Sequence, residues 1–203
     1  MLEELLQADQ KLLLFLNELH SPFFDVLICW LTHVWFWLPV LALLLWFMWK
    51  HYKKKMILIV AFSALSIVFS DQISGIIKNK TARLRPTHNT EINPKLHLHT
   101  HTKYCSLTKY GETYTGGEYG FVSSHAANSF ALTLLLIYFF KPINRRVRWL
   151  FILFPLIFSY TRIYLGVHYV SDIIGGALVG ICCGLFTIGL YYVVVKRIIF
   201  FNM

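Results

Sequence analysis

Charged residues are scarce in this sequence. Asp, Glu, Lys and Arg make up 14% of the 203 residues, whereas a soluble domain carries roughly 25%. Hydrophobic residues account for 57% of the chain and aromatic residues for 17%. This composition argues against an ordinary soluble domain and indicates a protein that resides in a lipid bilayer.

The N-terminus lacks the positively charged region and the small-residue cleavage site of a secretory signal. It begins instead with the acidic pair Glu3 and Glu4. We predict an amphipathic helix that lies in the membrane interface. Its lipid-facing residues would be Leu5, Leu6, Leu12, Leu13, Leu16 and Leu19. A sixth membrane-spanning helix is the alternative.

Cysteines are few, and their positions imply no disulfide framework. Cys29, Cys182 and Cys183 fall inside apolar runs, where cysteine behaves as a small apolar residue, and Cys105 is alone in a loop. Sequence repeats, low-complexity tracts and interdomain linkers are also lacking. We therefore expect residues 1–203 to form a single membrane domain.

Long apolar runs are what the sequence has in abundance. A helix needs about 20 apolar residues to cross the hydrocarbon core of a bilayer. The runs that meet this need are Val26–Trp49, Met56–Ile77, Phe121–Phe140, Trp149–Leu165, which is short, and Ile173–Val195. They predict an all-α, polytopic membrane helical bundle with about five transmembrane helices plus the N-terminal helix.

Basic residues indicate the topology, because Lys and Arg concentrate in cytoplasmic loops. Basic clusters lie at 50–55 and 141–148, and Lys196 and Arg197 follow the last run. All of them fall on one side if each run crosses the membrane once. The loop 78–120, the start of the third run and the connection between the last two runs then face the outside.

One cationic segment, 78–86, breaks this rule by lying on the outer side. Lys78 supplies a compact charge and Arg85 a planar fork, a combination that suits a phosphoryl group. Interface anchors that extend toward lipid headgroups are the alternative interpretation. An anionic ligand would explain the exception.

The third apolar run opens with Ser123, Ser124 and His125. Unpaired backbone N–H groups at a helix start bind anions, and serine hydroxyls add donors. Helix capping by a serine is the simpler interpretation. Capping does not explain His125.

Arg162 closes the fourth run, and His168 and Asp172 lie between it and the last run, where Gly166 allows the chain to turn. If the final helix begins near His168, Asp172 lies one turn later on the same face. Its carboxylate can then accept from one imidazole nitrogen and leave the other free to attack. A helix-surface ion pair is the alternative.

Together, Lys-x6-Arg-Pro, Ser-Ser-His and Arg-x5-His-x3-Asp resemble, in this order, the signature motifs of the type 2 phosphatidic acid phosphatase superfamily. The resemblance covers residues 78–172. It implies that His168 is the nucleophile, Asp172 its orienting partner and His125 the general acid. It further implies a phosphate clamp of Lys78, Arg85 and Arg162, assisted by Ser123 and the backbone N–H of Ser124. Val122, Ser124 and Thr161 stand where the family usually has Pro, Gly and Ser.

By this resemblance the chain is an integral membrane phosphatase that hydrolyses a lipid phosphomonoester or diphosphate through a phosphohistidine. Candidate substrates are undecaprenyl diphosphate, phosphatidylglycerophosphate, phosphatidic acid and a lipid A phosphate. The polar loop 87–120 favours a sugar-bearing lipid such as lipid A. We expect the site to face the periplasm or the outside of the cytoplasmic membrane.

The partners are then the lipid bilayer and its lipid phosphate; nucleic acid is not expected, and the oligomeric state is not indicated. Three fixed cations and two histidines suffice for phosphoryl transfer, so we expect no metal and no cofactor. A non-catalytic lipid-phosphate binder or transporter is the alternative, although binding does not require His168 and Asp172. A vanadate-holding haloperoxidase is a further alternative, which the apolar runs disfavour.

Other polar residues have weaker interpretations. His97, His99 and His101, with Cys105, could bind zinc, but their spacing favours a polar loop. Asp71 lies about two turns before Lys78, and we expect it to pair with a cation beneath the site. Finally, a spacing of four residues suits close helix packing for Gly176, Gly180 and Gly184.

Overall fold

The computed structural model describes residues 2–99, 105–109, 112–141 and 145–201. These residues form α-helices and short 3₁₀ helices, joined by loops. In chain order they are α1 (Leu2–Asn17), α2 (Pro22–Thr32), α3 (Val34–Tyr52), α4 (Lys55–Thr81), η1 (Pro86–His88), η2 (Asn93–Lys95), α5 (Ser124–Phe139), α6 (Arg145–Trp149), η3 (Leu150–Ile152), α7 (Leu153–Tyr164) and α8 (Val170–Phe201).

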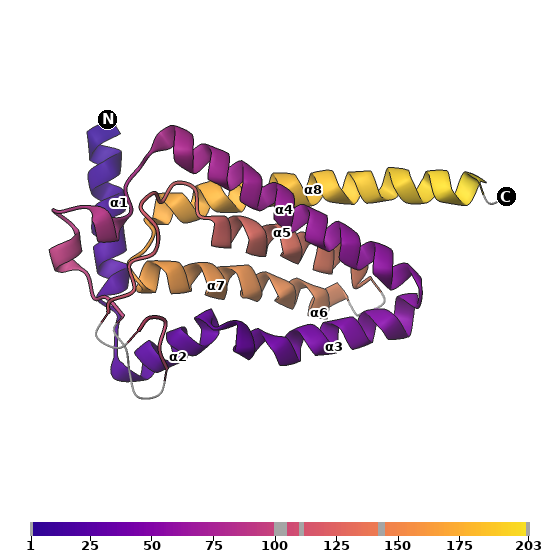
Figure 1. The fold of residues 1–203 in the computed structure, drawn as a ribbon, viewed down its shortest axis with the longest axis horizontal. Helices are drawn as coiled ribbons and strands as arrows, with labels where there is room; N and C mark the ends of the chain where they lie inside the picture. The colour runs from indigo at the N-terminus through magenta and orange to yellow at the C-terminus, as the bar shows by residue number, and fades with distance from the viewer. Residues whose placement is uncertain (1, 100–104, 110–111, 142–144, 202–203) are drawn as a thin grey trace.

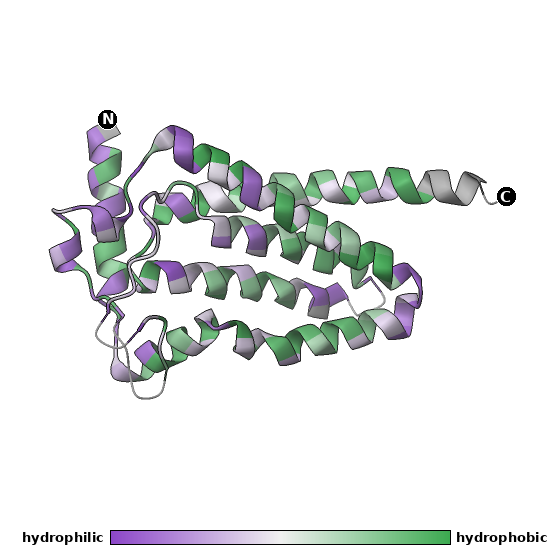
Figure 2. Ribbon diagram, in the orientation of Figure 1, coloured by the Kyte–Doolittle hydropathy of each residue, from purple (hydrophilic) through white to green (hydrophobic). Residues whose placement is uncertain are grey.

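The long helices run alongside one another as a bundle (Figure 1). Three of them, α3, α4 and α8, are long and apolar enough to cross a membrane, and α5 and α7 are shorter apolar helices. Hydrophobic residues predominate along their central parts, whereas hydrophilic residues gather at the ends (Figure 2). The structure therefore confirms the all-α membrane bundle.

The first apolar run differs from its prediction as one continuous helix. His33 has an extended backbone, with φ −74° and ψ 135°, and separates α2 from α3. Its Nε2 lies 2.7 Å from the carbonyl oxygen of Ser106, in the long loop. The residue at which the helix breaks, His33, is therefore also the residue whose side chain contacts the long loop.

α1 lies across one end of the bundle (Figure 1), bent by 108° from α2. Leu5 and Leu12 are exposed, as an interfacial helix requires, whereas Leu13 is fully buried against Ile92, Ile163 and Tyr169. Leu16 packs against the same cluster, so α1 agrees with the predicted amphipathic helix except that Leu13 and Leu16 face protein instead of lipid.

α5 packs closely against α8, and glycine makes this approach possible. A Cβ atom added at Gly180 would lie 2.2 Å from the carbonyl oxygen of Ala127, and one added at Gly176 would lie 2.4 Å from that of Ser123. At Gly184 the distance to the carbonyl oxygen of Ala131 would be 3.1 Å. The structure confirms the predicted packing role of these glycines.

The two ends of the bundle differ in their loops. The turn between α3 and α4, the end of α5, the start of α6 and the last turns of α8 lie at one end (Figure 1). The loop after α4, the start of α5 and the turn between α7 and α8 gather at the other end. The basic clusters therefore lie opposite the three motifs, as the charge pattern predicts.

Candidate active site

The turn from α7 into α8 places His168 beside Asp172. Gly166, at φ +68°, has the left-handed backbone conformation that glycine adopts most readily. Nδ1 of His168 lies 3.3 Å from Oδ2 of Asp172, and the backbone N–H of Tyr169 donates to the same oxygen at 3.0 Å. Both the imidazole and the carboxylate are fully buried.

This arrangement leaves one ring nitrogen of His168 available. Asp172 accepts from Nδ1, which assigns the proton to that nitrogen. Within the described part of the chain, Nε2 of His168 has no hydrogen-bond partner. A neutral imidazole with a free lone pair on Nε2 is suited to nucleophilic attack.

The start of α5 is hydrogen-bonded to the first turn of α8, which follows His168. The backbone N–H of Ser123 donates to the carbonyl of Asp172 at 2.9 Å. The Ser123 hydroxyl is buried and accepts from the N–H of Ala126 at 3.4 Å, so it caps α5. His125 is exposed on the first turn, and its ring lies 5.8 Å from that of Phe158.

The predicted cations come from three different elements. Lys78, in the last turn of α4, donates from Nζ to Oγ of Ser124 at 2.6 Å. Arg85 donates from Nε to the carbonyl of Tyr119 at 3.1 Å. Arg162 lies in the last turn of α7, and its side chain is almost completely buried.

Hydrogen bonds orient the buried guanidinium group of Arg162. Its Nε donates to Oγ1 of Thr161 at 3.0 Å, and its Nη2 donates to Oγ1 of Thr32 at 2.7 Å. Thr32 comes from α2, a helix that the motifs do not include. The position of Arg162 therefore depends on a contact that its sequence neighbourhood does not reveal.

Positive charge surrounds His168. Burial lowers the pKa of His168 well below its ordinary value, and the charges of Arg85, Lys78 and Arg162 lower it further. The same cations also act electrostatically on His125. Because like charges repel, this cluster is most stable with an anion bound among them. The structure thus brings Lys78, Arg85 and Arg162 together around His168, an arrangement suited to binding an anion.

Sequence reasoning missed several residues around this site. Arg83 donates to Asp172 and to Asp9 of α1. Tyr114, from the long loop, hydrogen-bonds to Arg162 and interacts electrostatically with Arg85. The cationic stretch 78–86 contains Arg83 and could have drawn attention to it, whereas no sequence signal linked it to α1.

Two weaker expectations have different outcomes. Asp71 is exposed on α4 and is in none of the ion pairs found among the described residues, but its charge acts on Lys78, so the predicted pairing holds only as an electrostatic interaction without a direct contact. His97 hydrogen-bonds to Asp25 at 2.8 Å and stacks on His20, which agrees with a polar loop. His101 lies outside the described residues.

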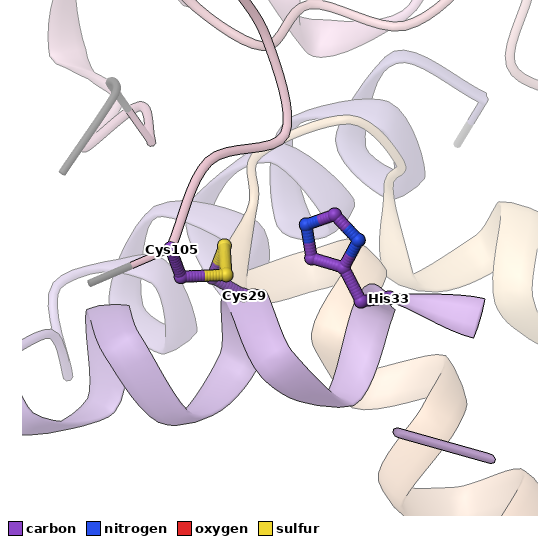
Figure 3. A group of neighbouring side chains, drawn as sticks. All are labelled: Cys29, His33 and Cys105. Carbon is purple, nitrogen blue, oxygen red and sulfur yellow. A yellow bond between two sulfur atoms is a disulfide. The ribbon is translucent and has the colours of Figure 1, made fainter. Parts of the chain in front are cut away.

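Cys29 and Cys105 form a disulfide (Figure 3), so the expectation that no disulfide is implied was wrong. Cys29 was assigned to the interior of a span, but α2 lies at the end of the bundle that carries the long loop. With a Cα–Cα distance of 6.1 Å, the two residues can be bridged. His33 completes a group with the spacing of metal ligands, but the disulfide occupies both thiols.

We expect the disulfide to stabilise the loop that faces the site. The double variant Cys29→Ser/Cys105→Ser should lose roughly 2–4 kcal/mol of stability, because the open chain regains conformational entropy. Thermal unfolding in detergent would measure the loss. Cys182→Ser, at an exposed free cysteine, is the matched control and should not change the midpoint. Equal midpoints for all three proteins would contradict this expectation.

Comparison with known proteins adds independent findings. The sequence profile of the PAP2 superfamily matches residues 57–197. A lipid A 4′-phosphatase of Bacteroides thetaiotaomicron is 38% identical over 186 residues, which are 89% of this chain and 75% of that protein. A lipid A 4′-phosphatase of Porphyromonas gingivalis is 31% identical over 192 residues, or 94% of this chain and 75% of that protein.

Two solved structures share the fold. The crystal structure of Aquifex aeolicus LpxE matches with a TM-score of 0.58 and 21% identity, over 88% of this chain and 93% of that one. The PAP2-type phosphatidylglycerolphosphate phosphatase of Bacillus subtilis matches with a TM-score of 0.60 and 18% identity, over 92% of this chain and 86% of that one.

Proposed function

Since the chain belongs to the PAP2 superfamily and is a membrane lipid phosphatase, we propose that its substrate is lipid A, from which it removes a phosphate group. The superfamily match confirms the resemblance of the three motifs. The choice of lipid A is carried by one observation: two relatives named lipid A 4′-phosphatase align with about nine-tenths of this chain.

The loop at the site end supports a large, polar head group. It contributes Tyr114 beside two of the clamp cations and packs against the turn from α7 into α8. Lipid A carries its phosphates on a disaccharide, whose hydroxyl and amide groups need such polar contacts. Apolar side chains exposed on α3, α4 and α8 provide the adjoining surface for acyl chains.

The geometry supports a two-step transfer. Nε2 of His168 attacks phosphorus, an N–P bond forms and the P–O bond to the sugar breaks, while His125 protonates the leaving oxygen. A water deprotonated by His125 then attacks the phosphohistidine, which releases inorganic phosphate and regenerates the imidazole. Asp172 keeps the Nδ1 proton in place and stabilises the positive charge that forms on the ring.

The clamp cations act mainly by neutralising the negative charge of the phosphate group. Lys78, Arg85 and Arg162 neutralise the phosphoryl oxygens beside the buried His168 and Asp172, where the effect of a charge is stronger than in bulk water. We assign Ser124 the role of holding Lys78 in position through its hydroxyl, in addition to the proposed N–H contact. Ser123 shapes the helix start as its cap.

We assign the site to the outer face of the cytoplasmic membrane. The basic clusters lie at the opposite end of the bundle, which favours a cytoplasmic location for that end. The Cys29–Cys105 disulfide lies at the site end, and disulfides persist in oxidising compartments such as the periplasm. Both observations support the same orientation.

Purified protein in detergent tests the proposal directly. Lipid A should release inorganic phosphate and lose the mass of one phosphate group, and tandem mass spectrometry should locate the lost group on the sugar. Phosphatidylglycerophosphate, phosphatidic acid and undecaprenyl diphosphate serve as competitors. Turnover should persist in excess chelator. Efficient cleavage of a competitor with none of lipid A would overturn the assignment.

The pH profile should reflect the lowered pKa of His168. The nucleophile must be neutral, and an ordinary histidine protonates near about pH 6.5. Because the pKa of His168 lies well below that value, its protonation should lower kcat/KM only at more acidic pH. Arg85→Gln removes one of the positive charges that lower this pKa, so the pKa of His168 should rise. The fall of kcat/KM on the acidic side of the pH profile, its acid limb, should then move to higher pH.

The comparison between the two proteins is the decisive measurement, because a phosphomonoester itself titrates near about pH 6. Lys80→Gln, at an exposed cation of the same segment, is the control and should keep the wild-type limb. An acid limb that stays unchanged in Arg85→Gln would contradict the electrostatic explanation.

A further inference from the structure

We propose that Arg83 and Asp9 are positioning residues of this phosphatase, through which helix α1 becomes part of the active site. Neither belongs to the three motifs. Arg83 would hold the free oxygen of the Asp172 carboxylate, and Asp9 would anchor Arg83 and the start of α8. The inference rests on the proposed function, because it assumes that Asp172 orients a catalytic His168.

Arg83 bridges two carboxylates with one guanidinium group. Its Nη1 donates to Oδ1 of Asp172 at 2.9 Å and to Oγ of Ser171 at 2.6 Å. Its Nη2 donates to Oδ2 of Asp9 at 2.8 Å. The Asp172 side chain is fully buried, that of Asp9 is 10% exposed and that of Arg83 is 22% exposed, so these charge-assisted bonds are partly shielded from water.

The two oxygens of Asp172 thereby have separate tasks. Oδ2 faces Nδ1 of His168, and Oδ1 is held by Arg83. A carboxylate fixed at both oxygens cannot rotate about its last bond without losing a hydrogen bond. Arg83 therefore sets the direction from which Asp172 orients the imidazole.

Asp9 connects this arrangement to α1. Its Oδ1 accepts from the backbone N–H of Ser171 at 3.0 Å, and its Oδ2 accepts from the Ser171 hydroxyl. The first N–H groups of a helix lack intrahelical partners and carry a partial positive charge. Asp9 supplies a carboxylate from another helix to the start of α8, one residue before Asp172.

An aromatic ring fixes the plane of the guanidinium group. Cζ of Arg83 lies 4.2 Å from the ring centroid of Tyr169. The backbone N–H of the same tyrosine donates to Oδ2 of Asp172. Tyr169 thus contacts both members of the Arg83–Asp172 pair and limits their relative movement.

Arg83 and Arg85 are close in sequence but differ in what they contact. The segment that carries them pairs with the loop before α5, through Gly120 N–H to the carbonyl of Arg83 at 2.8 Å and Arg85 N–H to that of Glu118 at 3.0 Å. In extended backbone, residues two apart point to the same side. Arg83 is engaged by two carboxylates, whereas the Arg85 side chain donates to backbone carbonyls of Tyr119 and Val167. Of these two arginines, Arg85 is therefore the one that would bind the substrate phosphate.

Steady-state kinetics of Arg83→Gln and Arg85→Gln separates these roles. Loss of a group that orients a catalytic side chain typically costs about 10- to 100-fold in activity. We expect Arg83→Gln to lower kcat by this factor with KM nearly unchanged, and Arg85→Gln to raise KM. Arg83→Lys keeps one charge and should restore part of kcat. Asp9→Asn should lower kcat less than Arg83→Gln, because Asn still accepts from Ser171.

Lys80→Gln is the matched control, since Lys80 is an exposed cation three residues before Arg83. It should keep the wild-type kcat and KM. Circular dichroism and gel filtration in detergent establish that each variant folds. A rise in KM with unchanged kcat in Arg83→Gln would mean that Arg83 binds phosphate and would overturn the proposal.

Hydrogen exchange provides a readout that does not depend on activity. Asp9→Ala should increase the exchange of α1 and of the N-terminal turn of α8, because it removes their shared contact, whereas Lys80→Gln should not. Wild-type exchange in Asp9→Ala would contradict the anchoring role. If the protein cleaves another phosphomonoester instead of lipid A, kcat and KM are measured with that substrate, and only the substrate assignment fails.

Discussion

His168→Asn is expected to abolish phosphatase activity, with kcat lowered by at least about 10³-fold. Asparagine can still donate a hydrogen bond toward Asp172, but its amide nitrogen has no lone pair available for attack. Lys78, Arg85 and Arg162 remain in place, so lipid A should still bind. The expected result is therefore a protein that binds its substrate without turning it over.

Single-turnover experiments would show why activity is lost. With radiolabelled lipid phosphate, the wild-type protein should form an acid-labile, alkali-stable phosphoprotein, as a phosphohistidine does, and His168→Asn should form none. His51→Asn is the matched control, because His51 packs against Phe47 in α3, away from the site residues, and should keep full activity. Labelling of His168→Asn at the wild-type rate would show that another residue is the nucleophile.

Gly180→Ala is expected to have the second large effect, this time on both stability and activity. In an open helix this change adds up to about 1 kcal/mol of helix propensity. At position 180, however, the new Cβ would lie 2.2 Å from the carbonyl oxygen of Ala127 and 3.0 Å from its Cα. These are backbone atoms, so α5 and α8 would have to separate, and overpacking of this kind costs roughly 1–3 kcal/mol.

The same separation should reduce turnover. His125 starts α5 and His168 precedes α8, so a shift between these helices changes the distance from the acid to the nucleophile. A misplacement of about 1 Å can cost up to about 10²-fold in rate. Thermal unfolding in detergent and kcat with lipid A would measure both consequences.

Gly189→Ala is the matched control on the same helix. A Cβ at Gly189 would meet no atom within 4 Å, so only the gain in helix propensity remains. This variant should be at least as stable as the wild-type protein and fully active. Equal behaviour of the two alanine variants would show that the close approach of α5 and α8 is not needed.

Much of the architecture was accessible from local sequence. Each apolar run corresponds to a helix or helix pair because the bilayer requires a minimum length of apolar residues, and this requirement is local. Charged and ionisable side chains near the ends of membrane helices cost free energy, so they are rare there unless they have a function. This argument singled out Lys78, Arg85, His125, His168 and Asp172 in the sequence. The order and spacing of these residues then indicated the family.

Contacts between distant segments were not accessible in this way. Cys29 was interpreted as a small apolar residue, because an apolar run in the sequence does not show that α2 lies at the end of the bundle where the long loop brings Cys105 close to it. Asp71 was given a partner because it shares a helix with Lys78; its charge does act on Lys78, but the hydrogen bond of Lys78 goes to Ser124 of α5. In both cases the partner is set by how helices pack, which residue type alone does not specify.

By itself, the sequence determined that this protein is a helical membrane phosphatase, and it predicted which residues carry the chemistry. Only the tertiary structure decided how these residues are held: Arg162 by Thr32 of α2, Asp172 by Arg83, and Arg83 by Asp9 of α1. The physical reason is the range of the interactions. Hydrophobic length and motif spacing act along the chain, whereas a buried charge takes whatever partner the fold brings within hydrogen-bonding distance.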